Sequence, residues 1–297
     1  MTRIRSSSTS RVRSRGGGGG GGFGLPGLGG GGGGGLGIPM KAGGGLIGLL
    51  VLAAAIFLPR LLGSTQGAIG SGASGAVDEQ QVPYQCDTEQ KQIICGATDD
   101  VAEYWIRAYG PSFGGQYQET TTEIFSGSTN TGCGQASSQV GPFYCPADGL
   151  VYFDLRFLTQ LQEQFNATGD LAAQYIVAHE YGHHVQNLLG TSGEVNRASQ
   201  QNPGQANTLS IALELQADCF AGAWARDAED RQQLEPGEIT EALEAAAAVG
   251  DDRIQQQTQG RVDPESWTHG SSDQRVSWFR RGFDTGDPRQ CDTFAEL

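Results

Sequence analysis

The chain has 297 residues, 47 of them glycine, and a formal net charge of -14, a size that suits one good-sized domain or two small ones. Its charge is divided: residues 1–77 contain seven basic residues and no acid, whereas the remainder carries all 33 acids against 12 bases. The acidic remainder argues against a nucleic-acid-binding protein, because contact with a phosphate backbone needs clustered Lys and Arg.

The first part of the chain is dominated by glycine. Residues 16–45 are mostly glycine with a few apolar side chains, which is too little apolar surface to offset the entropy lost when a glycine backbone is ordered. We therefore predict that residues 1–41 form a disordered, Arg/Gly-rich cytoplasmic arm. A second stretch rich in small residues, residues 64–77, is expected to be a linker.

An uninterrupted apolar segment lies between these two stretches. Its core is Leu46–Leu58, and with its flanks it extends over residues 42–63, close to the roughly 20 residues that span a bilayer. Because the arginines precede it, the positive-inside rule predicts one membrane crossing, a cytoplasmic amino terminus and an extracytoplasmic domain at 78–297. A cleaved signal peptide is the alternative, since the core also has the length of a signal-peptide apolar region and residues 74–76 are small.

All six cysteines follow the apolar segment. An even number of cysteines on the exported side of a membrane indicates disulfide bonds. Fifteen pairings exist formally for six cysteines, but the short spacings favour two local loops and leave one distant pair. The expected pairs are Cys86 with Cys95, Cys133 with Cys145, and Cys219 with Cys291.

The first half of the domain mixes helix and strand signals. Residues 99–109 predict a helix, with acids in its opening turn and Gly110-Pro111 at its end. Strand-forming residues at 117–125 and 151–157 are separated by turn residues and predict a small antiparallel sheet. Residues 155–165 are expected to turn helical.

The second half of the domain carries mainly helix signals. Asp170 and Asn207 are good amino-terminal caps, Gly190 is a carboxyl-terminal stop, and Pro236 suits a first helical turn. Residues 191–205 read as a polar loop. Helices are expected over residues 171–189, 208–228 and 237–248, and in the second half of 268–283.

Residues 179–183 read His-Glu-Tyr-Gly-His and match the His-Glu-x-x-His pattern of zinc hydrolases. Residues four apart lie on the same face of a helix, so His179 and His183 can offer two imidazole nitrogens to one metal ion. Glu180 then lies beside the metal, where a general base takes a proton from the attacking water. His184 points about 100° away from His183 and is expected to be an outer or surface residue rather than a ligand.

Catalytic zinc usually takes three protein ligands and a water, so a third ligand is needed. Glu214 and Asp218 lie one turn apart on one face of a helix that is otherwise rich in Ala and Leu. We expect Glu214 to bind the metal and Asp218 to accept the spare ring N–H of a histidine ligand, which fixes its tautomer. Cys219 follows Asp218, but a fourth protein ligand would displace the water, so a disulfide is expected there.

Four segments in combination resemble the bacterial neutral zinc metallopeptidase family. The Glu-x-x-x-Asp arrangement is also similar to the wider gluzincin clan, which includes thermolysin-like and CAAX-prenyl endopeptidases. The resemblance implies a zincin fold, a Zn²⁺ cofactor, Glu214 as third ligand and Asp218 behind the ligands. It covers the chain from about Val82 to the end, on the segments His179–Gln186, Glu214–Gly222, Gly141–Pro146 and Thr268–Ser272.

The fourth histidine lies in a late segment of its own. Residues 268–275 are similar to the Thr-His-Pro-Pro-x-x-x-Arg segment of the CAAX-type enzymes, with Gly270 in place of the first proline. In gluzincins a late histidine helps to stabilise the tetrahedral oxyanion, which needs a donor aimed at the developing charge. The resemblance implies this catalytic role for His269, with a structural histidine as the alternative, and leaves the role of Arg275 open.

These inferences predict a helix-dominated α+β, gluzincin-like metallopeptidase domain with a small antiparallel sheet, anchored in the cell membrane by one helix. Its substrate is expected to be a peptide or protein, held in extended form along a sheet edge. A zinc-binding envelope protein that serves as an interaction or scaffold module is the alternative, and a zinc hydrolase acting on other bonds is a third. Glu180 argues against the scaffold, because a purely structural site needs no base.

Overall fold

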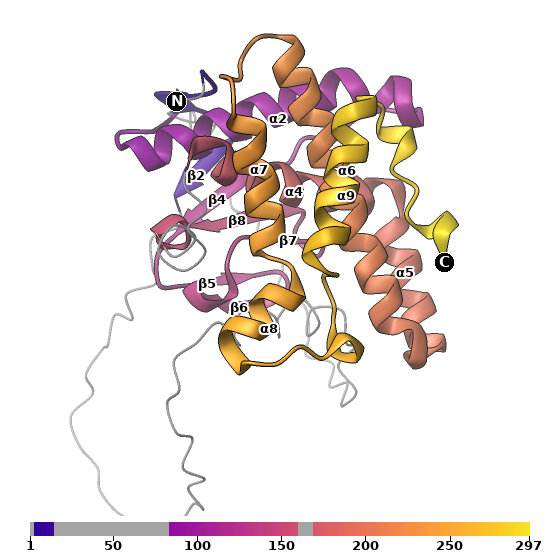
Figure 1. The fold of residues 1–297 in the computed structure, drawn as a ribbon. Coiled ribbons are helices and arrows are strands. Elements are labelled where there is room, and N and C mark those ends of the chain that lie inside the picture. The colour runs from indigo at the N-terminus through magenta and orange to yellow at the C-terminus, as the bar shows by residue number, and fades with distance from the viewer. Residues whose placement is uncertain (1–2, 15–82, 160–168) are drawn as a thin grey trace, which may run out of the picture.

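Helices make up most of the described chain, and three small sheets accompany them (Figure 1). The structure, a computed structural model, describes residues 3–14, 83–159 and 169–297. The helix-dominated α+β class expected from the sequence is confirmed. The helices are α2 (Glu89–Phe113), α4 (Asp170–Leu189), α5 (Thr191–Gln201), α6 (Ala206–Asp230), α7 (Glu238–Ala248), α8 (Asp251–Gln259) and α9 (Ser272–Thr285).

The main sheet has the strand order β2-β4-β8-β7 and is mixed. Strand β4 runs parallel to both β2 and β8, and only β7 is antiparallel to its neighbour β8. The predicted antiparallel pairing of the two main strands is therefore wrong: the hairpin β5-β6 and a disulfide loop separate β4 from β8, which gives the long crossover that parallel strands need. The strands are β1 (Ser8–Thr9), β2 (Val12–Ser14), β3 (Tyr84–Gln85), β4 (Thr122–Phe125), β5 (Ser128–Thr131), β6 (Gly134–Ser137), β7 (Phe143–Cys145) and β8 (Leu150–Asp154).

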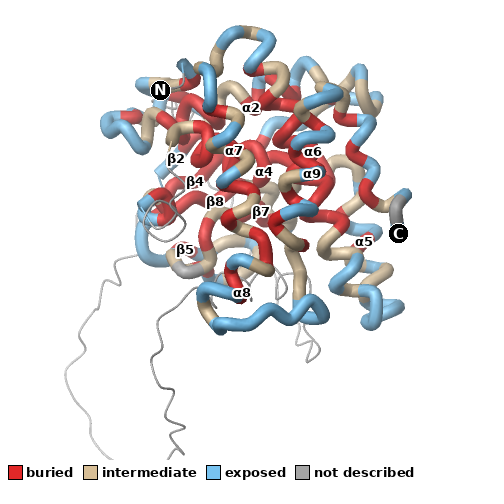
Figure 2. Tube along the Cα trace, in the orientation of Figure 1, coloured by how far each residue is buried: buried red, intermediate tan, exposed pale blue. Residues whose placement is uncertain are grey.

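Helix α4 lies at the centre of the molecule and is buried along most of its length (Figure 2). It packs against α2, α6, α7 and the β7–β8 side of the main sheet. A helix covered on all sides is usually apolar all round. The polar residues that α4 buries, including His179 and Glu180, are therefore the ones that need a chemical explanation.

Helices α6 and α9 touch through their backbones. A Cβ atom at Gly222 of α6 would lie 2.0 Å from the carbonyl oxygen of Phe279, and one at Gly282 of α9 would lie 1.9 Å from that of Cys219. Only a residue without a side chain fits at these crossings. The close contact brings Arg275 of α9 beside Asp218 of α6, where the two side chains form an ion pair.

Residues 3–14 correct the prediction of a disordered arm over residues 1–41. They are ordered on the domain: β1 pairs with β3, β2 pairs with β4, and the side chains of Ile4 and Val12 are buried. The prediction extended the disorder expected of the glycine-rich residues 16–45 to the start of the chain, but residues 3–14 are bound by strand edges and carboxylates that lie far away in the sequence. The rest of the arm lies outside the described residues.

The predicted membrane segment at 42–63 and the linker at 64–77 lie outside the described residues. Within the parts of the chain that the structure does describe, no helix has the length and apolar character needed to cross a bilayer. The proposed membrane crossing therefore stays a prediction.

Several helix boundaries differ from those expected. Helix α2 is much longer than the predicted 99–109 and runs through Gly110-Pro111 to end at Phe113. The N–H of the capping residue Gly114 donates to the carbonyl of Gly110. Asp170 is the first residue of α4 rather than its cap, and its carboxylate instead pairs with Arg5. The expected polar loop at 191–205 contains α5, and α8 was not predicted. The expected helix at 155–165 lies mostly outside the described residues.

Candidate metal centre

The three expected metal ligands meet between α4 and α6. The Nε2 atom of His179 lies 3.1 Å from Oε2 of Glu214, and Nε2 of His183 lies 3.5 Å from Oε1 of the same carboxylate. One ligand atom from each residue lies within 4.8 Å of the others. The sequence prediction of His179, His183 and Glu214 as neighbours is thus matched by the geometry.

The two helices can approach closely because small residues face each other beside the ligands. Gly182, inside the His-Glu-x-x-His motif, lies against Ala217 on α6. A Cβ atom at Gly182 would be 3.0 Å from the Cα of Ala217, tighter than an ordinary van der Waals contact of about 3.5–4 Å. A larger residue at either position would push the histidines away from Glu214.

The donor set fits a zinc ion chemically. Two imidazole nitrogens and a carboxylate oxygen are the ligands of catalytic zinc, which leaves a fourth position for water or substrate. Burial by itself raises the pKa of Glu214, but the neighbouring His183, His269 and His179 outweigh it and hold the pKa well below 4.5. The carboxylate is therefore ionised over the whole physiological range and available as a ligand.

The centre is also electrostatically suited to a cation. Burial by itself lowers the pKa of His179, but the carboxylates of Asp218 and Glu214 outweigh it and raise the pKa to about 9. The negative field that attracts a proton to this imidazole attracts a metal ion in the same way. Since a ligating histidine must be neutral, metal binding at His179 releases that proton.

Each of the two candidate ligand histidines has a hydrogen-bond partner for its other ring nitrogen. Nδ1 of His179 donates to Oδ1 of Asp218 at 2.9 Å, and Nδ1 of His183 lies 2.8 Å from Oε1 of Gln186. Such partners fix the tautomer and direct Nε2 toward the metal. The expected role of Asp218 agrees with this geometry. Gln186 was missed, although its position one turn after His183 on the same helix is a usable signal.

Asp218 is itself held by two further side chains. Tyr175 donates its hydroxyl to Oδ1, and Arg275 donates Nε to Oδ2 and Nη2 to Oδ1, at 2.8 and 2.9 Å. Asp218 is inaccessible to solvent and Arg275 is only 3% exposed. A buried carboxylate needs such partners, because an unpaired charge in the interior is costly. The sequence left the role of Arg275 open, and the structure places it on Asp218. The contact of Tyr175 with Asp218 was not predicted.

Glu180 follows His179 on α4 and is buried beside the ligand group. None of the described residues forms a hydrogen bond or ion pair with its carboxylate, in contrast to those of Glu214 and Asp218. A general base has to be free to take a proton and pass it on. The position and freedom of Glu180 agree with the role predicted for it.

His269 reaches the edge of the centre from the segment before α9. Its Nδ1 lies 3.3 Å from Oδ1 of Asp251 and 3.0 Å from the hydroxyl of Thr268. Asp251 also accepts the backbone N–H groups of residues 268–270 through Oδ2. Burial lowers the pKa of His269, but Glu214 and Asp251 outweigh it and raise the pKa above 6.5. Asp251 therefore orients His269, a role that the sequence did not reveal.

The family of the chain follows from comparison with known proteins. The sequence pattern of the family described as "Putative neutral zinc metallopeptidase" matches residues 6–294, nearly the whole chain. The chain belongs to this family. All three ligand positions of the centre lie within the match.

Two relatives are similar to the chain over most of its length. The chain is 52% identical over 206 residues to Uncharacterized protein YpfJ of Escherichia coli (strain K12), which covers 69% of this chain and 70% of the relative. It is 53% identical over 190 residues to Uncharacterized protein Rv2575 of Mycobacterium tuberculosis, which covers 60% of this chain and 64% of the relative. No solved structure matches the chain.

The structure also tests the predictions made for His184 and for the cysteines of this zinc metallopeptidase family member. His184 is buried, not on the surface, and lies away from the ligands: Nε2 donates to the carbonyl of Gln118 and Nδ1 faces the hydroxyl of Tyr144. Cys219 is bonded to Cys291, so it is no ligand. All three expected disulfides, Cys86–Cys95, Cys133–Cys145 and Cys219–Cys291, are formed.

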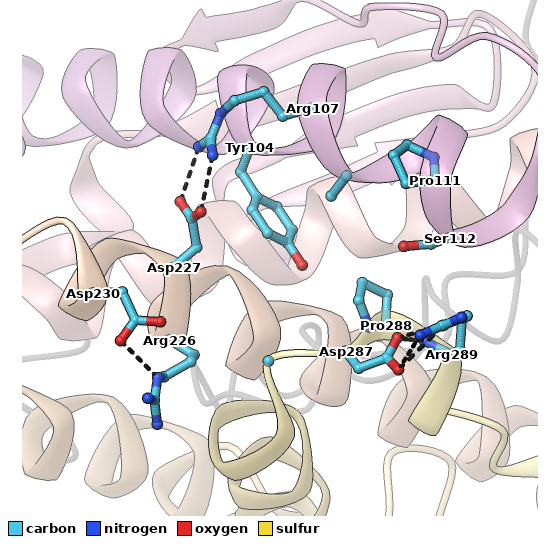
Figure 3. Close-up of a pocket in the computed structure, with 12 residues that line it drawn as sticks. Tyr104, Arg107, Pro111, Ser112, Arg226, Asp227, Asp230, Asp287, Pro288 and Arg289 are labelled. Atoms are coloured by element: carbon cyan, nitrogen blue, oxygen red, sulfur yellow. Dashed lines mark hydrogen bonds and ion pairs between the residues drawn. The ribbon is translucent and has the colours of Figure 1, made fainter.

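A cavity of about 470 Å³ lies elsewhere, between α2, the end of α6 and the segment that follows α9 (Figure 3). None of the predicted site residues lines it. Its guanidinium groups are already paired with neighbouring carboxylates, which leaves little free charge for a substrate. The pairs drawn there are Arg107 with Asp227, Arg226 with Asp230, and Arg289 with Asp287.

Proposed function

We propose that the protein is a zinc-dependent peptidase that hydrolyses peptide bonds with Glu180 as general base. The observation that carries this proposal is the meeting of His179, His183 and Glu214 beside a glutamate that no described residue engages. A structural zinc site closes all four positions with protein ligands, whereas three candidate ligands meet here among the described residues. The family membership supports the same conclusion.

His179, His183 and Glu214 would hold a zinc ion, which would supply Lewis-acid polarisation of the scissile carbonyl and raise the acidity of a water molecule. Glu180 takes the proton of the attacking water and returns it to the leaving amine. Asp218 and Gln186 keep the imidazoles of His179 and His183 in one orientation. The protein thus contributes a fixed geometry and a carboxylate that carries one proton from the water to the leaving amine.

We propose that His269 stabilises the oxyanion of the tetrahedral intermediate. Its Nδ1 is engaged by Asp251 and Thr268, so the opposite ring nitrogen, Nε2, is the atom that can donate to substrate. Because its pKa is raised, the ring carries a proton more readily than an isolated imidazole does. A donor aimed at developing negative charge stabilises the transition state more than the ground state.

The substrate we propose is an extended peptide that pairs with β7. This strand is the last of the main sheet, and it packs against α4, which carries the zinc ligands. Tyr144 of β7 contacts His184 and Asn187 of α4, so the strand edge is fixed relative to the centre. Backbone pairing with a strand edge is a common way to bind unfolded peptide.

We also propose that the domain works outside the cytoplasm. Three disulfides that include all six cysteines support this location, because such bonds persist in oxidising compartments and are rare in the cytosol. The membrane segment at residues 42–63 is predicted from the sequence alone, lies outside the described residues, and is not needed for this proposal.

The decisive experiment compares the purified full-length protein with its Glu180→Gln variant. We expect both to bind one zinc ion, and the variant to hydrolyse an unfolded protein at least about 10²-fold more slowly, the usual effect of removing a general base. Glu194→Gln, on the exposed part of α5, is the matched control and should behave as the unchanged protein. The measurements are zinc content by atomic absorption and initial rates of hydrolysis.

Two outcomes would contradict the proposal in different ways. Stoichiometric zinc without any Glu180-dependent peptide hydrolysis would favour the zinc-binding scaffold or a hydrolase of other bonds. A correctly folded protein that binds no zinc would remove the metal centre itself.

A further inference from the structure

The amino-terminal segment, residues 3–14, is joined to the domain by backbone hydrogen bonds along two strand edges. Ser8 pairs with Gln85 in the antiparallel β1–β3 ladder, and Val12 pairs with Thr122 in the parallel β2–β4 ladder. Before β1, the N–H of Ser6 donates to the carbonyl of Gln92, and the carbonyl of Ser7 accepts the N–H of Cys86. The segment is therefore bound along its length and not at one point.

The domain has a surface shaped for this segment. Gly96 lies in the middle of α2, where glycine costs about 1 kcal/mol relative to alanine, and a Cβ atom there would lie 2.5 Å from the Cα of Arg5 and 2.6 Å from the carbonyl of Ile4. Ile4 and Val12 are 4% and 2% exposed. The missing side chain at Gly96 thus leaves the space that the segment's backbone occupies.

Charge complementarity adds to the fit. The basic residues at the start of the chain and the acids of the domain, which the sequence separates, are paired in the structure. Four arginines of the segment contact carboxylates at seven domain positions: Arg3 with Glu235, Arg5 with Glu89 and Asp170, Arg11 with Asp99, Glu103 and Glu119, and Arg13 with Glu123.

Two of the contacts are made to the helix that carries the metal ligands. Gln174, which is fully buried, donates Nε2 to the carbonyl of Ile4 at 2.8 Å, and Asp170 pairs with Arg5 at 2.6 Å. Both residues lie in the first turns of α4, upstream of His179. The segment therefore holds the amino-terminal half of the metal-binding helix in place.

We propose that residues 3–14 are a structural part of the peptidase domain, bound to the surface formed by α2, α4, β3 and β4, and that they occupy the same compartment as the domain. A single membrane crossing within residues 42–63 would put Arg5 and Asp170 on opposite sides of the membrane. The contact and the predicted single-pass topology are therefore mutually exclusive. The occupant is the chain's own amino terminus, because backbone register, steric fit and arginine positions all match it.

The docking is tested on the full-length chain with a site for a specific protease inserted between residues 15 and 82. After cleavage and gel filtration under native conditions, we expect the amino-terminal fragment to stay with the domain and to leave it above about 1 M salt more readily than at low salt, since ion pairs are screened. Separation of the fragment from the unchanged protein at low salt would overturn the proposal. The readout is the mass of the recovered fragments and needs no peptidase activity.

Two variants show whether the fragment is held by the contacts described. Gly96→Ala introduces a Cβ that collides with the backbone of the segment, and the double variant Arg5→Ala/Arg11→Ala removes ion pairs without changing the domain; both should release the fragment. Gly193→Ala is the matched control, because a Cβ there meets only the end of the flexible Arg197 side chain at 3.6 Å. Retention of the fragment in both variants would contradict the proposed contacts.

The compartment is tested in intact cells with single added cysteines at Ser10, exposed in the segment, and at Gln200, exposed in the domain. All six natural cysteines are in disulfides, so the added thiol is the reactive one. We expect a membrane-impermeant maleimide to label both positions. Labelling at position 200 alone would overturn the proposal. Protection of both positions would support the shared compartment and contradict the extracytoplasmic location, which separates this inference from the proposed function.

Discussion

The Nδ1 atom of His179 lies 2.9 Å from Oδ1 of Asp218, a carboxylate that solvent does not reach. This contact joins the metal-binding helix α4 to α6, and through Arg275 to α9. A carboxylate in this position raises the basicity of the imidazole and fixes its tautomer. The affinity for metal should therefore depend on residues that never touch the ion.

Asp218→Asn should weaken zinc binding by about 10- to 100-fold, the usual cost of removing such a partner. The change keeps the size of the side chain but removes the charge that Arg275 and His179 share. Competition with a chromophoric chelator measures the affinity. Asp273→Asn, at an exposed position in the first turn of α9, is the control, and equal affinities in the two variants would argue against the role of Asp218.

His269→Ala should lower kcat by about 10²- to 10³-fold with little change in KM, because an oxyanion donor acts mainly in the transition state. Zinc content should stay the same. Asp251→Asn should lower kcat less, since it leaves the imidazole present but less well oriented. Steady-state kinetics on a peptide substrate measure both constants. If His269 is only structural, the variant will lose stability while its kcat stays close to that of the unchanged protein.

Gly282→Ala should destabilise the fold by about 3 kcal/mol, the upper end of the cost of overpacking a core. The added methyl group meets the backbone carbonyl of Cys219, which cannot rotate away as a side chain does. Urea denaturation measures the free energy of unfolding. Gly193→Ala lies on a helix with open surroundings and should leave stability unchanged or slightly higher; similar losses in both variants would contradict the tight crossing.

Loss of the Cys219–Cys291 bond should destabilise the protein more than loss of Cys86–Cys95. The two bonds close sequence separations of 72 and 9 residues, and in the chain-entropy description the longer loop is worth about 2 kcal/mol more. Paired Cys→Ala variants compared by thermal unfolding at equal zinc occupancy measure the difference. Equal losses would mean that folded-state contacts outweigh the loop entropy.

Asp227→Asn should cost stability at neutral pH and little at strongly acidic pH. Burial raises the pKa of Asp227, but hydrogen bonds from Arg107 and Arg231 outweigh it, so the folded-state pKa lies below the ordinary 3.8. The charged carboxylate therefore contributes to the free energy of unfolding above pH 3.8, the pKa of the unfolded state. This stabilisation is lost as the pH falls through the lower folded-state pKa. We expect a loss of about 1–2 kcal/mol at pH 7.

Denaturation of Asp227→Asn and the unchanged protein between pH 7 and pH 2.5 measures this dependence. Asp230→Asn, which removes an exposed pair with Arg226, is the control and should change stability little at any pH. A stability difference for Asp227→Asn that stays constant down to pH 2.5 would show that the carboxylate acts by packing and not by charge.

The sequence alone predicted the candidate ligands that the structure brings together, because helical periodicity places residues four apart on one face. His179 and His183, and likewise Glu214 and Asp218, were therefore assigned before their helices could be placed. Short spacing also gave two of the three disulfides and left Cys219 with Cys291 as the third pair. Cap and stop residues placed the ends of α4 and α7 within a few residues. These are all local properties of the chain.

The tertiary structure decided what depends on contacts between distant residues. Tyr175 and Asp251 are ordinary in the sequence, and only the packing of α4, α6 and the segment before α9 brings them to the metal centre. Residues 3–14 were predicted to be disordered. The prediction was wrong because the strand edges and carboxylates that bind them come after residue 82 and could not be paired with them from the sequence. Local sequence sets the faces of helices, but which faces meet is set by the free energy of burial in the whole fold.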